Sequence, residues 1–258
     1  MLRILDTKKK SAQNNMQMDI DLLDNLKDEP ILHFYDWEKD SITYGYFIDI
    51  KQFIDLKKAK KRDLNLAKRP TGGGIVFHIW DIAFSFLMPK NHKYFYLDPL
   101  KNYKFVNILI LQALEEFLVK KEENKKSKSY GLIDKEHFNE IKSFDSFCMA
   151  KPTKYDVVYK GKKIAGAAQR RKKTGYLHQA SICLIEPDFE YLKDVLLEKD
   201  IANAIFKSSY PIFLNENMNI EEKREIVKEK LIETFMSKFS KKTSTKSRKV
   251  NLVRSIDV

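Results

Sequence analysis

Cysteine and long apolar runs are both scarce in this 258-residue chain. Cys148 and Cys183 are its only cysteines, which is too few for a disulfide framework or for a zinc site closed by thiolates, and the sequence predicts no metal site. No run approaches the roughly 18 apolar residues that a membrane span needs. The stretch Met1–Lys8 has neither an apolar core nor a small-residue cleavage site, so we expect no secretory signal. These absences predict a cytoplasmic protein with no membrane partner.

What the chain does contain is enough apolar material for a core. Hydrophobic residues make up 43% of it, with 17 Phe and 12 Tyr, which excludes disorder along the whole length. The formal charge is +12, from 48 basic and 36 acidic residues. Because the two signs are mixed along the chain, we interpret the basic runs as solvated surface. The alternatives are a face for an acidic protein or phosphate-bearing ligand, and, less favoured, nucleic-acid binding.

Hydrophobic periodicity predicts both helices and strands. The expected helices cover residues 16–26, 51–61, 103–119 and 219–239. The expected strands are 31–35 and 41–44, which we expect to pair with each other, two strands within 75–88 that turn near Trp80, and then 155–159, 163–168 and 177–185. Since the strands come as close neighbours and do not alternate with helices, we predict an α+β fold with a mainly antiparallel sheet flanked by helices.

Three of the chain's eight glycines are consecutive, at Gly72, Gly73 and Gly74. An ordered glycine costs about 0.5–1 kcal/mol in backbone entropy, so the run needs a physical reason. One reason is a tight turn. The other is a ligand that lies directly against the backbone, and Arg69 just upstream suits a carboxylate or phosphate. No Gly-Lys-Ser or Gly-Lys-Thr follows, so this is not a Walker loop.

A second informative residue is Lys163, between a turn at Lys160–Gly161 and the small-residue run Ile164–Ala168. In a strand its side chain points to the face opposite Ile164. An ammonium held over a pocket stabilises the charge that develops during acyl transfer. The alternative is an ordinary solvated lysine at a turn.

Together the two stretches resemble the lipoate–protein ligase and octanoyltransferase family, which shares its catalytic fold with biotin–protein ligases. Residues 69–78 read Arg-Pro-Thr-Gly-Gly-Gly-Ile-Val-Phe-His, and residues 161–171 read Gly-Lys-Lys-Ile-Ala-Gly-Ala-Ala-Gln-Arg-Arg. Three further stretches are similar to family motifs, namely Asn15–Asp19, Ile42–Tyr46 and Leu177–Leu184. The last is similar to a His-His-Gly-Thr strand, but has Ala180 where the family has glycine.

The resemblance implies a biotin/lipoate ligase-like acyl-transfer domain over residues 1–215, with 216–258 as a C-terminal helix and basic tail that is not an independent domain. It implies that Lys163 is catalytic. The residues it implies for the acyl or acyl-adenylate pocket are Arg69, Gly72, Gly73, Gly74, His78, Gly166, Ala167, Ala180 and Ser181. The implied acceptors are lipoyl domains of 2-oxoacid dehydrogenase acyltransferase subunits or the glycine-cleavage H protein.

Two branches of the family remain open. Ligases activate lipoate with ATP and Mg as a lipoyl-adenylate, whereas transferases take octanoate from acyl carrier protein, in one branch through a cysteine thioester. Thiol-dependent transferases often carry arginine where this chain has Gly74, and glycine leaves room for a nucleotide. Arg69, Lys163 and Arg170–Arg171 suit an adenylate's phosphate. We therefore expect a lipoate–protein ligase.

The alternative is a thiol-dependent octanoyltransferase with Cys148 as its nucleophile. Cys148 precedes Tyr155 by seven residues, a spacing that resembles that branch, and Lys151 and Lys154 would stabilise its thiolate. Cys148 is otherwise a small apolar filler. The residue after His78 is also not the aspartate that ligases commonly have there. A third hypothesis, of another class, is a non-catalytic basic relative that binds nucleic acid or protein.

Overall fold

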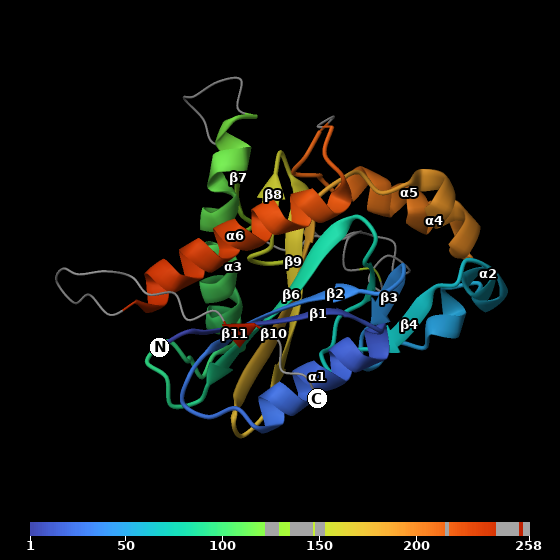
Figure 1. Cartoon of the computed structure of the whole chain (residues 1–258). Coiled ribbons are helices and arrows are strands. Elements are labelled where there is room, and N and C mark those ends of the chain that lie inside the picture. The colour runs from blue at the N-terminus through green and yellow to red at the C-terminus, as the bar shows by residue number, and fades with distance from the viewer. Residues whose placement is uncertain (122–128, 135–146, 148–152, 215–216, 241–252, 255–258) are drawn as a thin grey trace.

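The computed structural model places the chain in two sheets and six α-helices among the residues it describes, 1–121, 129–134, 147, 153–214, 217–240 and 253–254 (Figure 1). The larger sheet consists, in spatial order, of β11 (Val253–Arg254), β1 (Arg3–Lys10), β2 (Ile31–Trp37), β6 (Asp81–Pro89), β10 (Gly175–Cys183), β9 (Lys162–Arg171), β8 (Val157–Tyr159) and β7 (Tyr130–Leu132). The smaller sheet consists of β4 (Asn65–Lys68), β3 (Ser41–Tyr44) and β5 (Ile75–Phe77).

Capping residues in the sequence fix where the long helices begin. The helices are α1 (Ala12–Asp24), α2 (Leu56–Lys61), α3 (Pro99–Val119), α4 (Phe189–Val195), α5 (Lys199–Ser208) and α6 (Ile220–Phe239), with a 3₁₀ turn η1 (Ile50–Gln52). Ser11 caps α1 and Asp98 caps α3, each by accepting a backbone N–H, and Asn219 forms a capping box with Glu222 at α6. The expected helices at 16–26, 103–119 and 219–239 are confirmed, while the one at 51–61 divides into η1 and α2.

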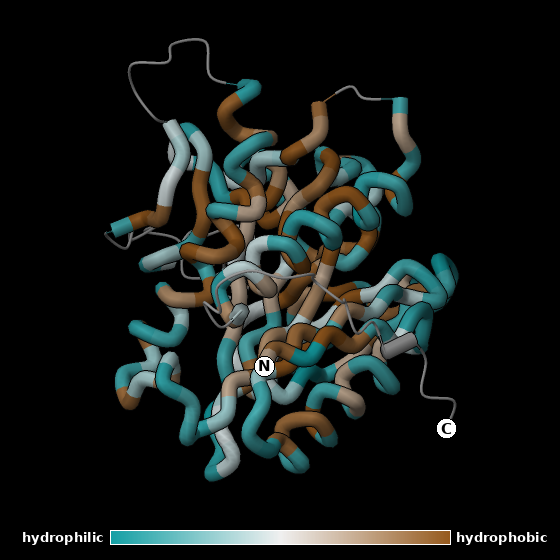
Figure 2. The backbone as a smooth tube through the Cα atoms, turned by 60° about the vertical axis from the view of Figure 1, so that its left-hand side comes forward, coloured by the Kyte–Doolittle hydropathy of each residue, from teal (hydrophilic) through white to brown (hydrophobic). Residues whose placement is uncertain are grey.

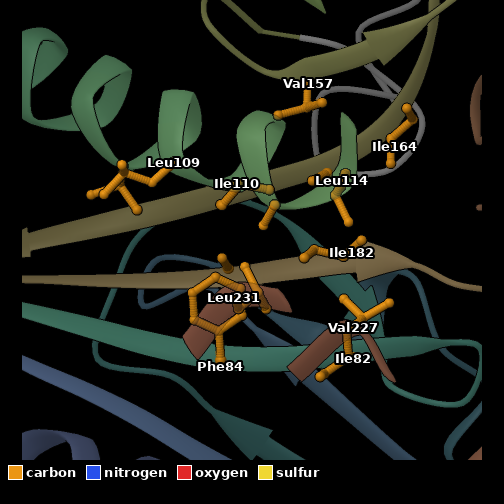
Figure 3. Packing of buried hydrophobic residues seen from close by; sticks show 14 of the residues in the cluster. Ile82, Phe84, Leu109, Ile110, Leu114, Val157, Ile164, Ile182, Val227 and Leu231 are labelled. Carbon is orange, nitrogen blue, oxygen red and sulfur yellow. The ribbon is translucent and has the colours of Figure 1, made fainter. Parts of the chain in front are cut away.

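The main core lies between the large sheet and the crossed helices α3 and α6. From α3, Ile110 and Leu114 face Ile182 of the sheet (Figure 3). From α6, Val227 and Leu231 complete the layer. Burial of each such side chain contributes about 1.5–3 kcal/mol. The sheet's opposite face is covered by α1, so every residue of the central strands β6 and β10 is buried.

One expected pairing is wrong. Strand β2 lies between β1 and β6 in the large sheet, whereas β3 lies between β4 and β5 in the small one, so 31–35 and 41–44 do not pair. Their composition predicted the strands but could not choose their partners, because β2 is taken up by β1, parallel to it, and by β6. The mainly antiparallel character is confirmed. In the large sheet, the spatial order β2, β6, β10, β9, β8, β7 contains only antiparallel pairs of neighbours.

The chain crosses from one sheet to the other after β5, the strand that follows the glycine run. Strand β5 belongs to the small sheet and β6 to the large, and residues 78–80 connect them. Hydrophobic segments gather in the interior, and the peripheral turns are mostly hydrophilic (Figure 2). Among the described residues, no helix combines the length and the hydropathy that crossing a bilayer requires.

Candidate active site

A cavity of about 30 Å³ lies where the two sheets meet, which is room for one or two water molecules. Most of the predicted site residues line it, namely Arg69, His78, Lys163, Gly166, Ala167, Ala180 and Ser181. The sequence did not identify the other lining residues, which are Met16, Tyr35, Thr43, Val76, Ala168 and Gln179. Segments far apart in the chain thus converge on one cavity.

Lys163 reaches the cavity as half of a buried ion pair. Its Nζ lies 2.7 Å from Oδ2 of Asp156, and the two side chains are 3% and 0% exposed. The carboxylate also accepts hydrogen bonds from the Tyr103 hydroxyl at 2.5 Å and from the Thr153 N–H at 2.7 Å. A buried ammonium without such compensation is costly, because its lost hydration is not replaced. Asp156 therefore holds Lys163 in place beside the cavity.

Tyr103 is a neutral donor to this carboxylate. Burial, with the Asp156 charge beside it, holds the pKa of Tyr103 well above its usual range. Its hydroxyl also accepts the backbone N–H of Ala167 at 3.0 Å, on β9. A residue of α3 thus connects the lysine's partner to the strand that carries the lysine.

Gly166 makes space for Lys163. A Cβ at this position would lie 2.1 Å from Cε and 2.3 Å from Nζ of Lys163. Distances this short do not occur between non-bonded atoms, so a side chain at residue 166 would displace the ammonium. The lysine side chain therefore lies directly over the Gly166 backbone.

Arg69 holds the glycine run in shape from the cavity side. It is 4% exposed, and its guanidinium donates to the carbonyl oxygens of Gly72 at 3.1 Å and Gly74 at 2.7 Å, and to Oγ1 of Thr43 at 3.2 Å. We predicted Arg69 as a partner for a carboxylate or phosphate. In the structure it both lines the cavity and positions the loop.

The three consecutive glycines, which we expected in the pocket, are not among the residues that line this cavity. Gly73 is exposed and has a φ of 78°, a conformation that favours glycine, and its oxygen lies where a Cβ on Gly45 would be, at 1.9 Å. A Cβ on Gly72 would meet nothing within 4 Å. Packing therefore explains the glycine at residue 45, while the space before Gly72 is open to an approaching ligand.

His78 belongs to a second buried polar cluster. Its Nδ1 lies 2.8 Å from Oδ2 of Asp81, its Nε2 lies 2.8 Å from Oγ1 of Thr43, and its ring stacks on Trp37 at 4.3 Å. Ser181 donates to the same carboxylate at 2.5 Å. Asp81 is three residues beyond His78 and returns to it because the chain turns between β5 and β6.

A third cluster connects the glycine loop with α1. Gln179 accepts a hydrogen bond from the Thr71 hydroxyl at 2.7 Å and donates to Oδ2 of Asp19 at 2.7 Å. Asp19 is also bonded to His33 at 2.8 Å and to Ser85 at 2.6 Å. Gln179 lies in the strand that departs from the family motif, and here its amide joins two elements.

The structure describes only one of the two cysteines, Cys183. Cys148 lies outside the described residues, but its neighbour Phe147 is buried and forms a parallel bridge with Ile75, the residue after Gly74. Cys183 is buried, and burial raises the pKa of its thiol, which donates to the carbonyl of Ile185 at 3.3 Å. No cluster of metal-ligating side chains occurs within the described part of the chain.

Comparison with known proteins identifies the family of the chain. The family model of the lipoyl protein ligase A/B catalytic domain matches residues 11–241. The chain belongs to this family. It is therefore an enzyme of the lipoate ligase and octanoyltransferase group, and the resemblance seen in the sequence is confirmed.

Similar proteins come from both branches of the family. The octanoyltransferase LipM of Staphylococcus epidermidis is 30% identical over 202 residues, which cover 76% of this chain and 70% of that protein. The LipM of Bacillus subtilis is 29% identical over 204 residues, which cover 76% of this chain and 69% of that protein.

The similar solved structures are ligases. A lipoate-protein ligase A bound with ATP has a TM-score of 0.66 at 23% identity, covering 91% of this chain and 86% of that one. A bi-partite lipoate protein ligase from Thermoplasma acidophilum, solved with its E2 lipoyl domain, has a TM-score of 0.63 at 24% identity, covering 91% and 84%. At this identity they establish the shared fold, which confirms the fold predicted from the sequence.

Proposed function

We propose that this enzyme is an octanoyltransferase that moves an octanoyl group from acyl carrier protein to a lysine of a lipoyl domain through a thioester on Cys148. The observation that carries the proposal is the 29–30% identity, over three quarters of the chain, to proteins named octanoyltransferase LipM. It favours the alternative that the sequence left open over the ligase that we expected.

The contrast between the two cysteines supports the thioester route. A nucleophilic cysteine has to form a thiolate, and the buried Cys183, with its raised pKa, is unsuited to that role. Cys148 remains, and its neighbour Phe147 bridges to Ile75 at the end of the glycine run. A covalent carrier one residue after Phe147 in the chain fits a reaction in two acyl-transfer steps.

In the proposed reaction, the Cys148 thiolate attacks the thioester carbonyl of the donor, and the carrier's thiol leaves with a proton. The acceptor lysine, as a neutral amine, then attacks the new thioester. An amide forms, the amine loses a proton, and the Cys148 thiol is restored. Negative charge develops on the carbonyl oxygen in both steps, and we assign its stabilisation to the Lys163 ammonium, which is paired with Asp156. Neither step consumes ATP.

A ligase that uses lipoate, ATP and Mg is the second candidate. The likeness of the fold to an ATP-bound ligase favours it, as does the small residue at Gly74. In that reaction Lys163 and Arg69 would face the phosphate of a lipoyl-adenylate. The two candidates differ in their need for a thiol and for a nucleotide.

Intact-mass spectrometry of a purified lipoyl domain separates them. We expect octanoylation from octanoyl-acyl carrier protein without ATP, an octanoyl adduct on the enzyme itself, and loss of both in Cys148→Ser. The matched control is Cys183→Ser, which should retain both. ATP-dependent lipoylation that survives Cys148→Ser would instead establish the ligase. If neither condition gives transfer and the protein binds nucleic acid in a salt-sensitive way, the non-catalytic hypothesis is supported instead.

A further inference from the structure

Two aromatic side chains beside the glycine loop face solvent. Phe47 is 89% exposed and Tyr46 is 51% exposed. Their rings contact each other edge to face, with centroids 5.2 Å apart. A large apolar ring that is almost fully hydrated gains nothing from folding, so packing among the described residues does not explain Phe47.

Cationic side chains flank these rings. The Nζ of Lys68 lies 5.3 Å from the centroid of the Tyr46 ring, and Cζ of Arg170 lies 5.7 Å from it. We call Tyr46, Phe47, Lys68 and Arg170 the Tyr46 patch. Aromatic residues and arginine are enriched in the buried centres of protein interfaces. Lysine and arginine around them favour an acidic partner over a basic or neutral one.

The Tyr46 patch is attached to the outside of the glycine loop. The Tyr46 N–H donates to the carbonyl of Thr71 at 3.0 Å, and the Arg170 guanidinium donates to the carbonyl of Pro70 at 3.0 Å. Chain neighbours continue from the patch to the cavity, since Arg69 follows Lys68 and Ala168 precedes Arg170 by two residues on the same face of β9. The patch therefore borders the active-site region.

The chemistry of the acyl acceptor indicates that the patch binds the acceptor and not the donor. A lysine side chain is a flexible stem of four carbons, so the body of the acceptor has to touch the enzyme close to the reacting carbonyl. An acyl donor carried on a long prosthetic arm has no such requirement. Residues that surround the cavity are thus available to recognise the acceptor's surface.

We propose that the Tyr46 patch is the docking surface for the acceptor, a small acidic domain that presents its target lysine beside the glycine loop. The proposal rests on the proposed function for the identity of that acceptor. Phe47 inserts into the acceptor's surface, and Lys68 and Arg170 face its carboxylates.

The test measures steady-state transfer from octanoyl-acyl carrier protein to a purified lipoyl domain, together with the rate at which the enzyme itself becomes octanoylated. In Phe47→Ser and in Lys68→Glu we expect the KM for the lipoyl domain to rise about tenfold, with kcat and enzyme octanoylation unchanged. Raised salt should weaken the wild type more than Lys68→Glu. Matched controls are Val119→Ser, 48% exposed at the end of α3, and Lys27→Glu, exposed beyond the end of α1, and both should keep the wild-type KM.

Two results would overturn the proposal. One is an unchanged KM for the lipoyl domain in both patch variants, and the other is a rise in the KM for the carrier protein alone, which would assign the patch to the donor. If the wild type is never octanoylated, the proposed function fails separately. Calorimetric titration of the same variants with the lipoyl domain then still decides whether the patch binds it, by a loss of affinity of about tenfold or by none.

Discussion

Lys163 owes its position to a residue that has no side chain. Its ammonium lies across Gly166 and against Asp156, so strand β9 supplies both the charged group and the space that it needs. The sequence placed Lys163 and Gly166 in one site by family resemblance. Neither Asp156 nor Tyr103 was identified, because their contacts with the lysine depend on how β9 meets β8 and α3.

We predict that Gly166→Ala lowers the rate of acyl transfer by 10-fold or more, on the order of what displacement of one catalytic charge costs. The new methyl group would occupy the place of Lys163 Cε and Nζ and push the ammonium away from Asp156. Single-turnover acylation of the lipoyl domain measures the effect. Gly131→Ala is the matched control, because a Cβ at residue 131 meets nothing within 4 Å, and its rate should equal that of the wild type.

His178 makes stability depend on pH. Burial lowers the pKa of His178 to about 3, and its Nε2 has no hydrogen-bond partner in the described structure. In the unfolded chain a histidine takes up a proton below a pH of about 6.5. Between these two values the unfolded state binds the extra proton, so the free energy of unfolding falls as the pH falls.

We therefore expect the urea midpoint of the wild type to drop between pH 7 and pH 4.5 by more than that of His178→Gln. The glutamine variant has no group at this position that titrates in the interval. Equal pH dependence in the two proteins would show that His178 is not a neutral, buried imidazole.

At the scale of elements, the glycine loop is held from two sides. Arg69 binds its carbonyl oxygens, and Gln179 joins Thr71 of the loop to Asp19 of α1. The loop is therefore fixed to the helix on the opposite face of the large sheet from α3 and α6.

Removing the Gln179 amide should loosen this loop without unfolding the protein. In Gln179→Leu we expect faster hydrogen exchange at the amides of residues 71–74 and a higher KM for the acyl donor. The loss of two buried hydrogen bonds should also cost about 2–4 kcal/mol of stability. Exchange measured by mass spectrometry at the loop and at α3 checks the prediction, and α3 should be protected as in the wild type.

How far the sequence predicted these elements depended on how local each signal was. Periodicity identified α1, α3 and α6, β-branched and aromatic residues identified β8 and β10, and the apolar, small-residue run Ile164–Ala168 after a turn identified β9. The strand β1 was missed because its basic residues at 8–10 were interpreted as solvated surface. The predicted pairing of β2 with β3 was wrong because the sequence of a strand does not specify which strand it pairs with. The acidic residues Asp19, Asp81 and Asp156 were missed for the same reason, since each meets its partners only in the folded chain.

For the whole molecule, the C-terminal helix is part of the main core. Val227, Leu231 and Phe235 of α6 are 0% exposed and belong to the same cluster as the sheet residues Phe84 and Phe86. The division of the chain at residue 215 remains a prediction. The packing nevertheless means that the segment after it contributes to the stability of the domain.

We expect Phe235→Ala to lower the free energy of unfolding by about 3–5 kcal/mol, because a buried aromatic ring is replaced by a cavity. Chemical denaturation followed by tryptophan fluorescence measures this change. Phe239→Ala at the end of the same helix should cost less, since that ring is only partly buried. Equal, small losses in both variants would mean that α6 packs only loosely on the sheet.

The number of residues between Arg69 and Asp81 determines how the side chains of the site are aligned. Residues 69–81 supply the glycine loop, a strand of the small sheet, His78 and the first residue of a central strand of the large one. A single deletion or insertion there would reverse which side chains of the following strand point inward. It would also pull His78 away from Asp81. Variation in length among related enzymes should therefore fall in surface connections and spare this segment.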